Sequence, residues 1–276
     1  MKVVSRTMDK EIFNKFRSLI YQVSGISLSE EKEALVCARV GKRMRRLGLS
    51  CHGQYLDLVM NDESGHELVH LLNAISTNVT SFYRESGHFD FLTTVVQEWL
   101  RKGQRRFRFW SAACSTGAEP YTMAITLSEA FEGKDCDMKI LATDINTSVL
   151  ETAMAGRYSK DKIDGVPPLL RGKYFDATSE GGQTVFEVCS AIKSKVLFRH
   201  VNLSTPPFPL KGGLDAVFCR NVMIYFDNRV RRALLDELYR VLKPGGYLFV
   251  GHAESLTGMM SEFKIVRPSI YVKRTE

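Results

Sequence analysis

The segment Arg106–Tyr121 combines residue types that could hold a small ligand against the main chain. It starts with the strand-forming residues Phe107, Phe109 and Trp110, continues with small residues, and reaches Pro120, which suits the first turn of a helix. Small residues let the main chain approach a nucleoside closely, and parallel sheets bind ligands beyond the carboxyl ends of their strands. The pattern indicates either a ligand-binding loop or an ordinary buried turn between a strand and a helix.

A carboxylate follows on the next predicted strand. The apolar run Met138–Ile145 contains Asp144 near its end, where nucleoside-binding folds place the acid that binds the ribose. Asp144 also suits the N-terminus of the helix predicted at Ser148–Ala155, so ribose binding and helix capping are both open. The loop contains Gly117 but lacks a complete G-x-G-x-x-G motif. This favours a nucleoside ligand without a pyrophosphate, such as S-adenosylmethionine.

Five motifs in a fixed order extend this pattern over nearly the whole chain. They are Asn78–Glu85 (NVTSFYRE), Ser111–Tyr121 (SAACSTGAEPY), Ala142–Ile145 (ATDI), Phe218–Phe226 (FCRNVMIYF) and Leu242–Leu248 (LKPGGYL). Together they resemble the CheR family of chemotaxis receptor glutamate methyltransferases. The resemblance implies S-adenosylmethionine as cofactor and S-adenosylhomocysteine as product. It also implies esterification of glutamates in the cytoplasmic domain of methyl-accepting chemotaxis receptors.

The resemblance assigns roles to individual residues. Arg84 and Tyr225 would act at the reacting centre, Arg84 by holding a carboxylate or the cofactor charge and Tyr225 by orienting an oxygen. The residues expected to bind the cofactor are Asn78, Thr80, Arg84, Glu119, Asp144, Arg220 and Asn221. Asn202 and Leu203 are added for a different reason: the run that ends at His200 should place them at the carboxyl end of the sheet, where an adenine could be bracketed. For Asn78 and Thr80, capping and turn hydrogen bonds are the alternative. A glutamate carboxylate, with a reference pKa of about 4.3, is already ionised at neutral pH, so no general base is required. The enzyme must instead desolvate and aim it.

A basic helix face lies near the N-terminus. Residues 9–76 have helical apolar spacing, and a second helix after Ser29 carries the apolar stripe Val36, Val40, Met44 and Leu47. Arg39, Lys42, Arg43 and Arg46 share another face of that helix. We expect this face to bind the receptor substrate, and the alternative is a solvated helix face.

The elements imply an α/β protein with two domains. We expect an N-terminal all-helical domain at 1–77 and a Rossmann-like methyltransferase domain at 78–276, with a mostly parallel seven-stranded sheet. Three β-like runs, Lys173–Asp176, Thr184–Val188 and Lys195–His200, indicate a small antiparallel β-subdomain inserted at about 160–200, and the last run should also enter the main sheet. In part of the CheR family this subdomain binds a receptor C-terminal tail peptide, which we include as a candidate partner. Lys243–Gly246 reads as a turn before the strand Tyr247–Val250.

Composition limits the remaining classes. The chain has 276 residues and a formal net charge of +7, which favours an acidic partner. No apolar run approaches 18 residues, so we expect no membrane insertion and a cytoplasmic enzyme recruited to receptor arrays. The six cysteines form no C-x-x-C pair, and Cys114 has no nearby histidine to activate it, so we expect reduced, packed thiols. His66 and His70 share a helix face but lack a third ligand, and no metal site is expected.

Two other functions share parts of this pattern. A nucleic-acid methyltransferase would explain the positive charge, but the Asn/Asp-Pro-Pro-Tyr signature of amino-methylating enzymes is absent, because Arg220 and Asn221 are followed by valine and methionine. A non-catalytic adaptor would keep the fold and lose reaction-centre residues, whereas Arg84, Asn221 and Tyr225 are present. We therefore expect a protein methyltransferase without a nucleic-acid partner.

Overall fold

The first part of the chain is a helical domain, as its apolar spacing predicts. The computed structural model describes residues 7–256, 259 and 262–275. The helical elements are α1 (Lys10–Ser24), the 3₁₀ helix η1 (Glu30–Lys32), α2 (Glu33–Leu47), α3 (His52–Asn61) and α4 (His66–Ile75). α1 is capped by the side chain of Asp9 and ends at Gly25, whose φ of 68° favours glycine. The predicted end of the first helix at Gly25 is confirmed.

The apolar stripe of α2 packs into the core of this domain. Val36, Val40 and Met44 are completely buried together with Phe16 of α1. Leu47, the last residue of the helix, is 38% exposed. The stripe therefore ends one turn earlier than predicted, and its prediction is wrong for Leu47.

The second part is an α/β domain built on one seven-stranded sheet. The strands are β1 (Arg106–Ala112), β2 (Asp137–Asp144), β6 (Val196–His200), β7 (Leu214–Cys219), β8 (Leu242–Phe249), β9 (Phe263–Arg267) and β10 (Ile270–Lys273). Their order is β6-β2-β1-β7-β8-β10-β9, and only β10 pairs antiparallel with its neighbours. The mostly parallel seven-stranded sheet is confirmed.

The segment predicted as a Lys-Pro-Gly-Gly turn is instead the first half of β8. Leu242 already pairs with Leu214, and the register shifts before Ala216 pairs with Tyr247. Gly245 adopts a φ of 72° within this irregular stretch. The predicted turn before the strand is therefore an irregularity within β8, because pairing with β7 begins at Leu242 and resumes at Tyr247.

Helices cover both faces of the sheet. They are α5 (Gly87–Arg101), α6 (Ala118–Ala130), α7 (Thr147–Ala155) and α11 (Asn228–Val241), with the 3₁₀ helix η2 (Met223–Tyr225) after β7. Phe107 and Phe109 of β1 belong to the core cluster that contains Leu92 of α5. Trp110, the next residue, belongs to a second cluster with Leu234 of α11. Alternating side chains of β1 thus anchor two helical layers.

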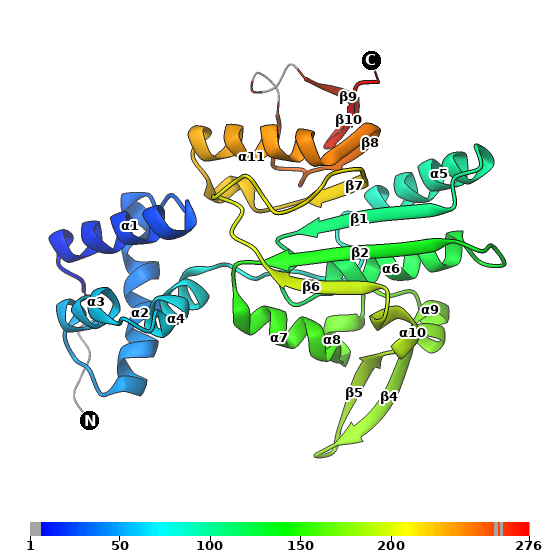
Figure 1. Ribbon diagram of the computed structural model, residues 1–276. Helices are drawn as coiled ribbons and strands as arrows, with labels where there is room; N and C mark the ends of the chain where they lie inside the picture. The colour runs from blue at the N-terminus through cyan, green and yellow to red at the C-terminus, as the bar shows by residue number, and fades with distance from the viewer. Residues whose placement is uncertain (1–6, 257–258, 260–261, 276) are drawn as a thin grey trace.

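A three-stranded antiparallel sheet projects from the main domain (Figure 1). It consists of β3 (Arg157–Ser159), β4 (Phe175–Glu180) and β5 (Gln183–Val188) in the order β3-β5-β4, with the short helices α8 (Lys160–Ile163), α9 (Pro168–Tyr174) and α10 (Ser190–Lys193). β6 follows and joins the main sheet beside β2, as expected. Lys173 and Tyr174 end α9, so the first predicted run starts as helix, and β3 was not anticipated. That strand is only three residues long, too short for a sequence pattern.

The helical domain lies at the carboxyl ends of the parallel strands, and β4 and β5 of the small sheet project below β6 in the same view (Figure 1). Ile26 forms an antiparallel bridge with Phe226, and the side-chain amide of Asn202 donates to the carbonyl oxygen of Val23 at 2.7 Å. Within the described part of the chain, no helix is both long and apolar enough to cross a membrane.

Candidate active site

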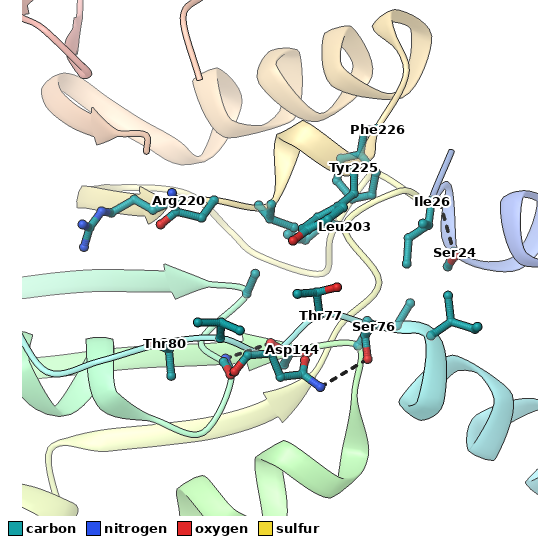
Figure 2. Close-up of a pocket in the computed structure, with 18 of the residues that line it drawn as sticks. Ser24, Ile26, Ser76, Thr77, Thr80, Asp144, Leu203, Arg220, Tyr225 and Phe226 are labelled. Atoms are coloured by element: carbon teal, nitrogen blue, oxygen red, sulfur yellow. Dashed lines mark hydrogen bonds between the residues drawn. The ribbon is translucent and has the colours of Figure 1, made fainter. Parts of the chain in front are cut away.

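A pocket lies where the helical domain meets the carboxyl ends of the parallel strands. It contains about 1140 Å³ of empty space, part of it open to solvent, which is room for a nucleoside-sized ligand. Figure 2 shows Ser24 and Ile26 of the helical domain on one side, Thr80 of the linker and Asp144 below, and Tyr225 above. Every residue predicted to bind the cofactor or act at the reacting centre lines this pocket: Asn78, Thr80, Arg84, Glu119, Asp144, Asn202, Leu203, Arg220, Asn221 and Tyr225.

The backbone around the pocket is unusually rich in left-handed residues. Of six non-glycine residues with positive φ in the described part of the chain, five belong to the segments that form the pocket. They are Tyr83, Glu85, Ala113, Ser115 and Asn221, with φ between 49° and 66°. Such conformations are costly for residues with a side chain and persist only where surrounding contacts impose them. Tertiary contacts therefore hold these three loops in place.

Asp144, at the end of β2, holds the loop that follows β1. Its Oδ2 atom accepts the backbone N–H of Ser115 at 2.8 Å, and its Oδ1 atom accepts that of Asn146 at 2.9 Å. Burial raises the pKa of this carboxyl group. The cap of α7 is Asn146, whose side chain accepts the N–H of Val149 at 3.2 Å. The capping alternative for Asp144 is therefore wrong, and the helix begins at Thr147, one residue earlier than predicted.

Glu119, in the first turn of α6, forms a buried ion pair with Arg220. The Arg220 Nη1 atom lies 3.1 Å from Oε2 of Glu119, and the hydroxyl of Ser111 donates to Oε1 at 2.7 Å. Burial raises the pKa of Glu119, while Arg220 opposes this shift. Arg220 also donates to the carbonyl oxygen of Arg84 at 2.6 Å and to Glu85 at 2.9 Å. Its guanidinium group thus positions two segments of the pocket wall.

The segment that carries Arg84 is tightly shaped. Arg84 lies between the left-handed residues Tyr83 and Glu85, and its Nη1 atom donates to the carbonyl oxygen of Val79 at 3.0 Å. Asn78 contacts the loop that follows β1 through its carbonyl oxygen, which accepts the hydroxyl of Ser115 at 2.9 Å. The linker between the domains therefore forms part of the pocket wall.

Asn202 and Leu203 follow β6 and differ in what they present to the pocket. The amide nitrogen of Asn202 is bonded to Val23, and its oxygen accepts the backbone N–H of Ser204 at 3.0 Å and the hydroxyl of Ser204 at 2.8 Å. Leu203 is an apolar wall that faces Asp144 across the pocket (Figure 2). An adenine ring in this position would pack against Leu203, while the Asn202 side chain fastens the helical domain.

Glu254 supports the site and was not singled out from the sequence. Its Oε2 atom accepts the backbone N–H groups of Asn221 at 2.6 Å and Gly251 at 2.7 Å, and its Oε1 atom accepts that of Ile224 at 3.3 Å. The residue is buried, so these bonds fix the loop between Arg220 and Tyr225. The only signal in the sequence is an acid shortly after the strand predicted at Tyr247–Val250.

The basic face of α2 divides into two pairs. Arg43 makes a bidentate ion pair with Glu67 of α4, at 2.8 and 2.7 Å. Arg39 donates to the carbonyl oxygens of Ile75 and Ser76 at the end of α4, and it also lines the pocket. Lys42 and Arg46 are exposed and form no ion pair with any described residue.

The other candidate residues have quieter surroundings. Cys114 is buried in the core, and burial raises the pKa of its thiol well above the usual range, so it is a packed thiol at neutral pH, as expected. His66 and His70 are both exposed on α4. The described residues do contain a cluster of metal-ligand types elsewhere, formed by Glu85, His88 and His252.

Comparison with known proteins gives consistent results over the whole chain. Residues 11–76 match the family model "CheR methyltransferase, all-alpha domain", and residues 78–272 match "CheR methyltransferase, SAM binding domain". Chemotaxis protein methyltransferase 2 of Pseudomonas aeruginosa is 36% identical over 262 residues, covering 95% of this chain and 92% of that protein. The chemotaxis protein methyltransferase of Salmonella typhimurium is 37% identical over 259 residues, covering 94% of this chain and 88% of that protein.

Solved structures with similar folds are more distant. A SAM-dependent methyltransferase from Methanosarcina mazei aligns with a TM-score of 0.30 and 20% identity, covering 53% of this chain and 52% of that chain.

Proposed function

The chain belongs to the CheR methyltransferase family and is an S-adenosylmethionine-dependent methyltransferase, and from this premise we propose that it methylates glutamate side chains in the cytoplasmic helices of chemotaxis receptors. The observation that carries the proposal is the make-up of the pocket. Arg84 and Tyr225 line the same pocket as the loop that follows β1, and no histidine is among the lining residues of the described chain. Such a site suits an acceptor that arrives already ionised.

The donor set fits S-adenosylmethionine, which supplies a methyl group on a sulfonium sulfur when bound. The buried carboxylate of Asp144 would accept the ribose hydroxyls, and Leu203 would pack against the adenine. Glu119, held by Arg220, offers a second carboxylate to the positively charged amino acid end. Asn78, Thr80 and Asn221 also line the pocket and would add polar contacts to the cofactor.

Arg84 and Tyr225 would act on the acceptor. In this proposal the guanidinium of Arg84 holds the substrate carboxylate, and the hydroxyl of Tyr225 orients one of its oxygens. The helical domain lines one side of the pocket, which would leave the substrate carboxylate partly desolvated. Positioning and desolvation of this kind lower the barrier without a proton transfer.

The face of Arg39, Lys42, Arg43 and Arg46 would dock an acidic receptor helix. Lys42 and Arg46 are available for such contacts, and Arg39 lies where the face reaches the pocket. Arg43 would contribute indirectly, because its pair with Glu67 fixes α2 against α4. Each exposed ion pair is worth only about 0.2–1 kcal/mol, so docking is collective and sensitive to salt.

The edge strand β4 would bind the receptor C-terminal tail. β4 has one neighbour, β5, and five of its six residues are exposed. An extended peptide could add a strand there, with backbone hydrogen bonds for affinity and alternate side chains for selectivity. Docking through both surfaces would recruit a cytoplasmic enzyme to receptor arrays.

A base-release assay tests the proposed acceptor. Full-length protein is incubated with methyl-labelled S-adenosylmethionine and a receptor cytoplasmic fragment, and mild base is then added. Methyl esters release labelled methanol, and a fragment with its glutamates changed to alanine should release none. Duplex DNA and RNA serve as alternative acceptors. Label that stays on the protein in base, or that appears on nucleic acid, would contradict carboxylate methylation.

A further inference from the structure

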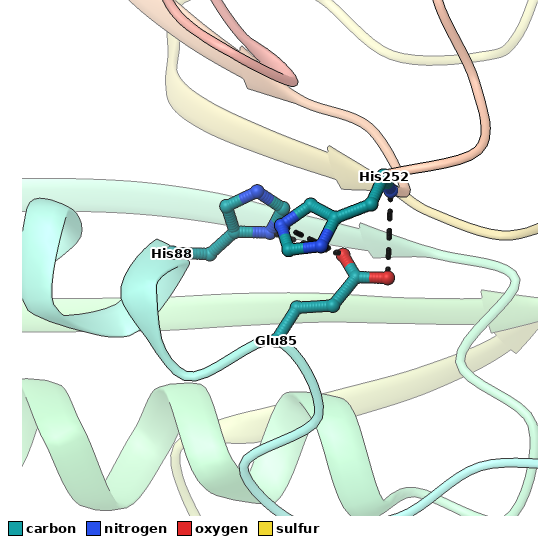
Figure 3. Close-up of side chains that lie close together, drawn as sticks. All are labelled: Glu85, His88 and His252. Atoms are coloured by element: carbon teal, nitrogen blue, oxygen red, sulfur yellow. Dashed lines mark hydrogen bonds and ion pairs between the residues drawn. The ribbon is translucent and has the colours of Figure 1, made fainter.

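Glu85, His88 and His252 bring three metal-ligand groups together beside the pocket (Figure 3). Glu85 and His88 lie where the Arg84 segment enters α5, and His252 follows β8 at the same edge of the sheet. The candidate ligand atoms all lie within 4.8 Å of one another. Oε2 of Glu85 is 3.6 Å from Nδ1 of His88 and 3.9 Å from Nε2 of His252.

His88 has surroundings that call for a partner. Its ring is 2% exposed, yet neither nitrogen has a hydrogen-bond partner among the described residues. Phe218 and Phe249 pack against the ring and hold its orientation. A neutral imidazole has one nitrogen lone pair that can bind a metal ion. Buried polar atoms without partners are destabilising, and an ion at this point would satisfy one of them.

We propose that Glu85, His88 and His252 bind a divalent transition-metal ion, with Zn²⁺ as the expected ion. Two imidazoles and one carboxylate are the ligand set of open zinc sites, which keep a fourth position for water. Zinc–ligand distances of about 2.0–2.2 Å place tetrahedral ligands about 3.3 Å apart. The two Glu85–histidine separations are 3.6 and 3.9 Å and the third separation is at most 4.8 Å, so the ligand atoms must approach one another by at most about 1.5 Å. The His252 side chain is 65% exposed and free to make them.

Arg220 affects both the affinity of this site for the ion and the effect of the bound ion on the cofactor. Its Nη2 atom lies 2.9 Å from the same oxygen of Glu85, so the ion must share that carboxylate with a guanidinium group, which weakens binding. Arg220 keeps Glu119 and the carbonyl oxygen of Arg84 as partners when Glu85 turns to the ion. Because Arg220 lines the pocket, the ion adds positive charge near the cofactor. It disfavours the sulfonium of S-adenosylmethionine more than the neutral sulfur of the product, and so inhibits the enzyme.

Calorimetry with Zn²⁺ and the full chain tests the site independently of methylation. One ion per chain is expected, and His252→Ala should weaken binding at least about tenfold. The matched control is the double variant His66→Ala/His70→Ala, which removes the exposed histidines of α4 and should bind the ion as the parent does. No stoichiometric binding, unchanged binding in His252→Ala, or loss in the control variant would overturn the proposal.

Cobalt spectroscopy reports metal coordination by residue 252 directly, and a purely structural role of this residue would not produce the signal. In a Cys51→Ser background, which removes an exposed thiol, His252→Cys should produce sulfur-to-cobalt charge-transfer absorption with Co²⁺. Absence of this band in a folded variant would place residue 252 outside the coordination sphere. Titration with each cofactor form then tests the consequence: Zn²⁺ should weaken S-adenosylmethionine binding severalfold and S-adenosylhomocysteine binding less. Equal effects on the two would remove the inhibitory role.

Discussion

The backbone N–H of Ser27 donates a 2.8 Å hydrogen bond to the carbonyl oxygen of Tyr225. The helical domain is thereby fastened to the segment that carries the proposed reaction-centre tyrosine. The Asn202 amide, bonded to the carbonyl oxygen of Val23, makes a second attachment nearby. These contacts join the domain interface to the wall of the pocket, so we expect changes at the interface to alter cofactor binding.

We therefore expect Asn202→Ala to destabilise the protein and weaken S-adenosylmethionine binding. The change leaves the partly buried carbonyl oxygen of Val23 without its donor, which should lower the free energy of unfolding by about 1–3 kcal/mol. Ser204→Ala is the matched control, because it removes one bond to Asn202 and keeps the bond to Val23. Thermal unfolding and calorimetry measure both effects. Equal results for the two variants would show that the Val23 bond does not hold the domains.

Asp144→Ala should weaken the binding of S-adenosylmethionine and of its product alike. The change removes a buried carboxylate that holds Ser115 and faces the pocket, and the expected loss is about 1.5–3 kcal/mol of binding free energy. Asp137→Asn, at the exposed opposite end of β2, is the control and should leave affinity unchanged. If calorimetry found full affinity in folded Asp144→Ala, the ribose role would be lost.

Reversing the charges of Lys42 and Arg46 should raise the KM for receptor fragments and leave cofactor affinity unchanged. Both residues are exposed and unpaired among the described residues, so their substitution should not disturb the fold. Arg101→Glu with Lys211→Glu changes the net charge equally at two exposed residues outside the helical domain. Steady-state kinetics at two salt concentrations separate the cases. If neither the charge reversal nor the salt concentration changed the KM, this surface of α2 would be a solvated helix face without a docking role.

Arg43→Ala should lower stability and also change its pH dependence. The bidentate contact with Arg43 lowers the pKa of Glu67, so this pair stabilises the folded state above the ordinary carboxyl pKa and loses its effect as pH falls. The free energy of unfolding of the variant should be about 1–3 kcal/mol lower than that of the parent at pH 7. It should also decrease less than that of the parent when the pH falls. Arg45→Ala, which removes an exposed neighbour, is the control. Urea unfolding between pH 3 and pH 7, a range that extends from below to above the reference glutamate pKa of about 4.3, measures the difference.

Single-turnover methylation should rise with ionisation of the substrate carboxylate and then stay level through neutrality. Tyr225→Phe should cost about 0.5–1.5 kcal/mol of activation free energy, as loss of one neutral hydrogen bond does. Arg84→Ala should cost more, and Arg84→Lys should restore only part, since a point charge cannot reproduce the planar fork. A rate limb near neutral pH that disappears in a histidine or tyrosine variant would show that a protein base takes part.

Most of the fold could be predicted because its signals are local. The helix end at Gly25, the strand run that contains Asp144 and the helix start indicated by Pro120 all depend on residues close together in the chain. The CheR-like motifs contain eight of the residues predicted for the site, Asn202 and Leu203 follow the run that ends at His200, and all ten line one pocket. The turn predicted at Lys243–Gly246 was wrong because its local signal was ambiguous: these residues form an irregularity within β8, between two residues that pair with β7.

Only the tertiary structure decided which acidic and basic side chains form ion pairs with one another. Arg220 meets Glu85 and Glu119 across more than a hundred residues of chain, and no spacing rule predicts that triad. The four bases of α2 are equivalent by helical period, yet the packing of α4 gives Arg43 a buried partner and leaves Lys42 exposed. Periodicity determines which face a side chain shares, whereas the partner that it meets depends on how separate elements pack.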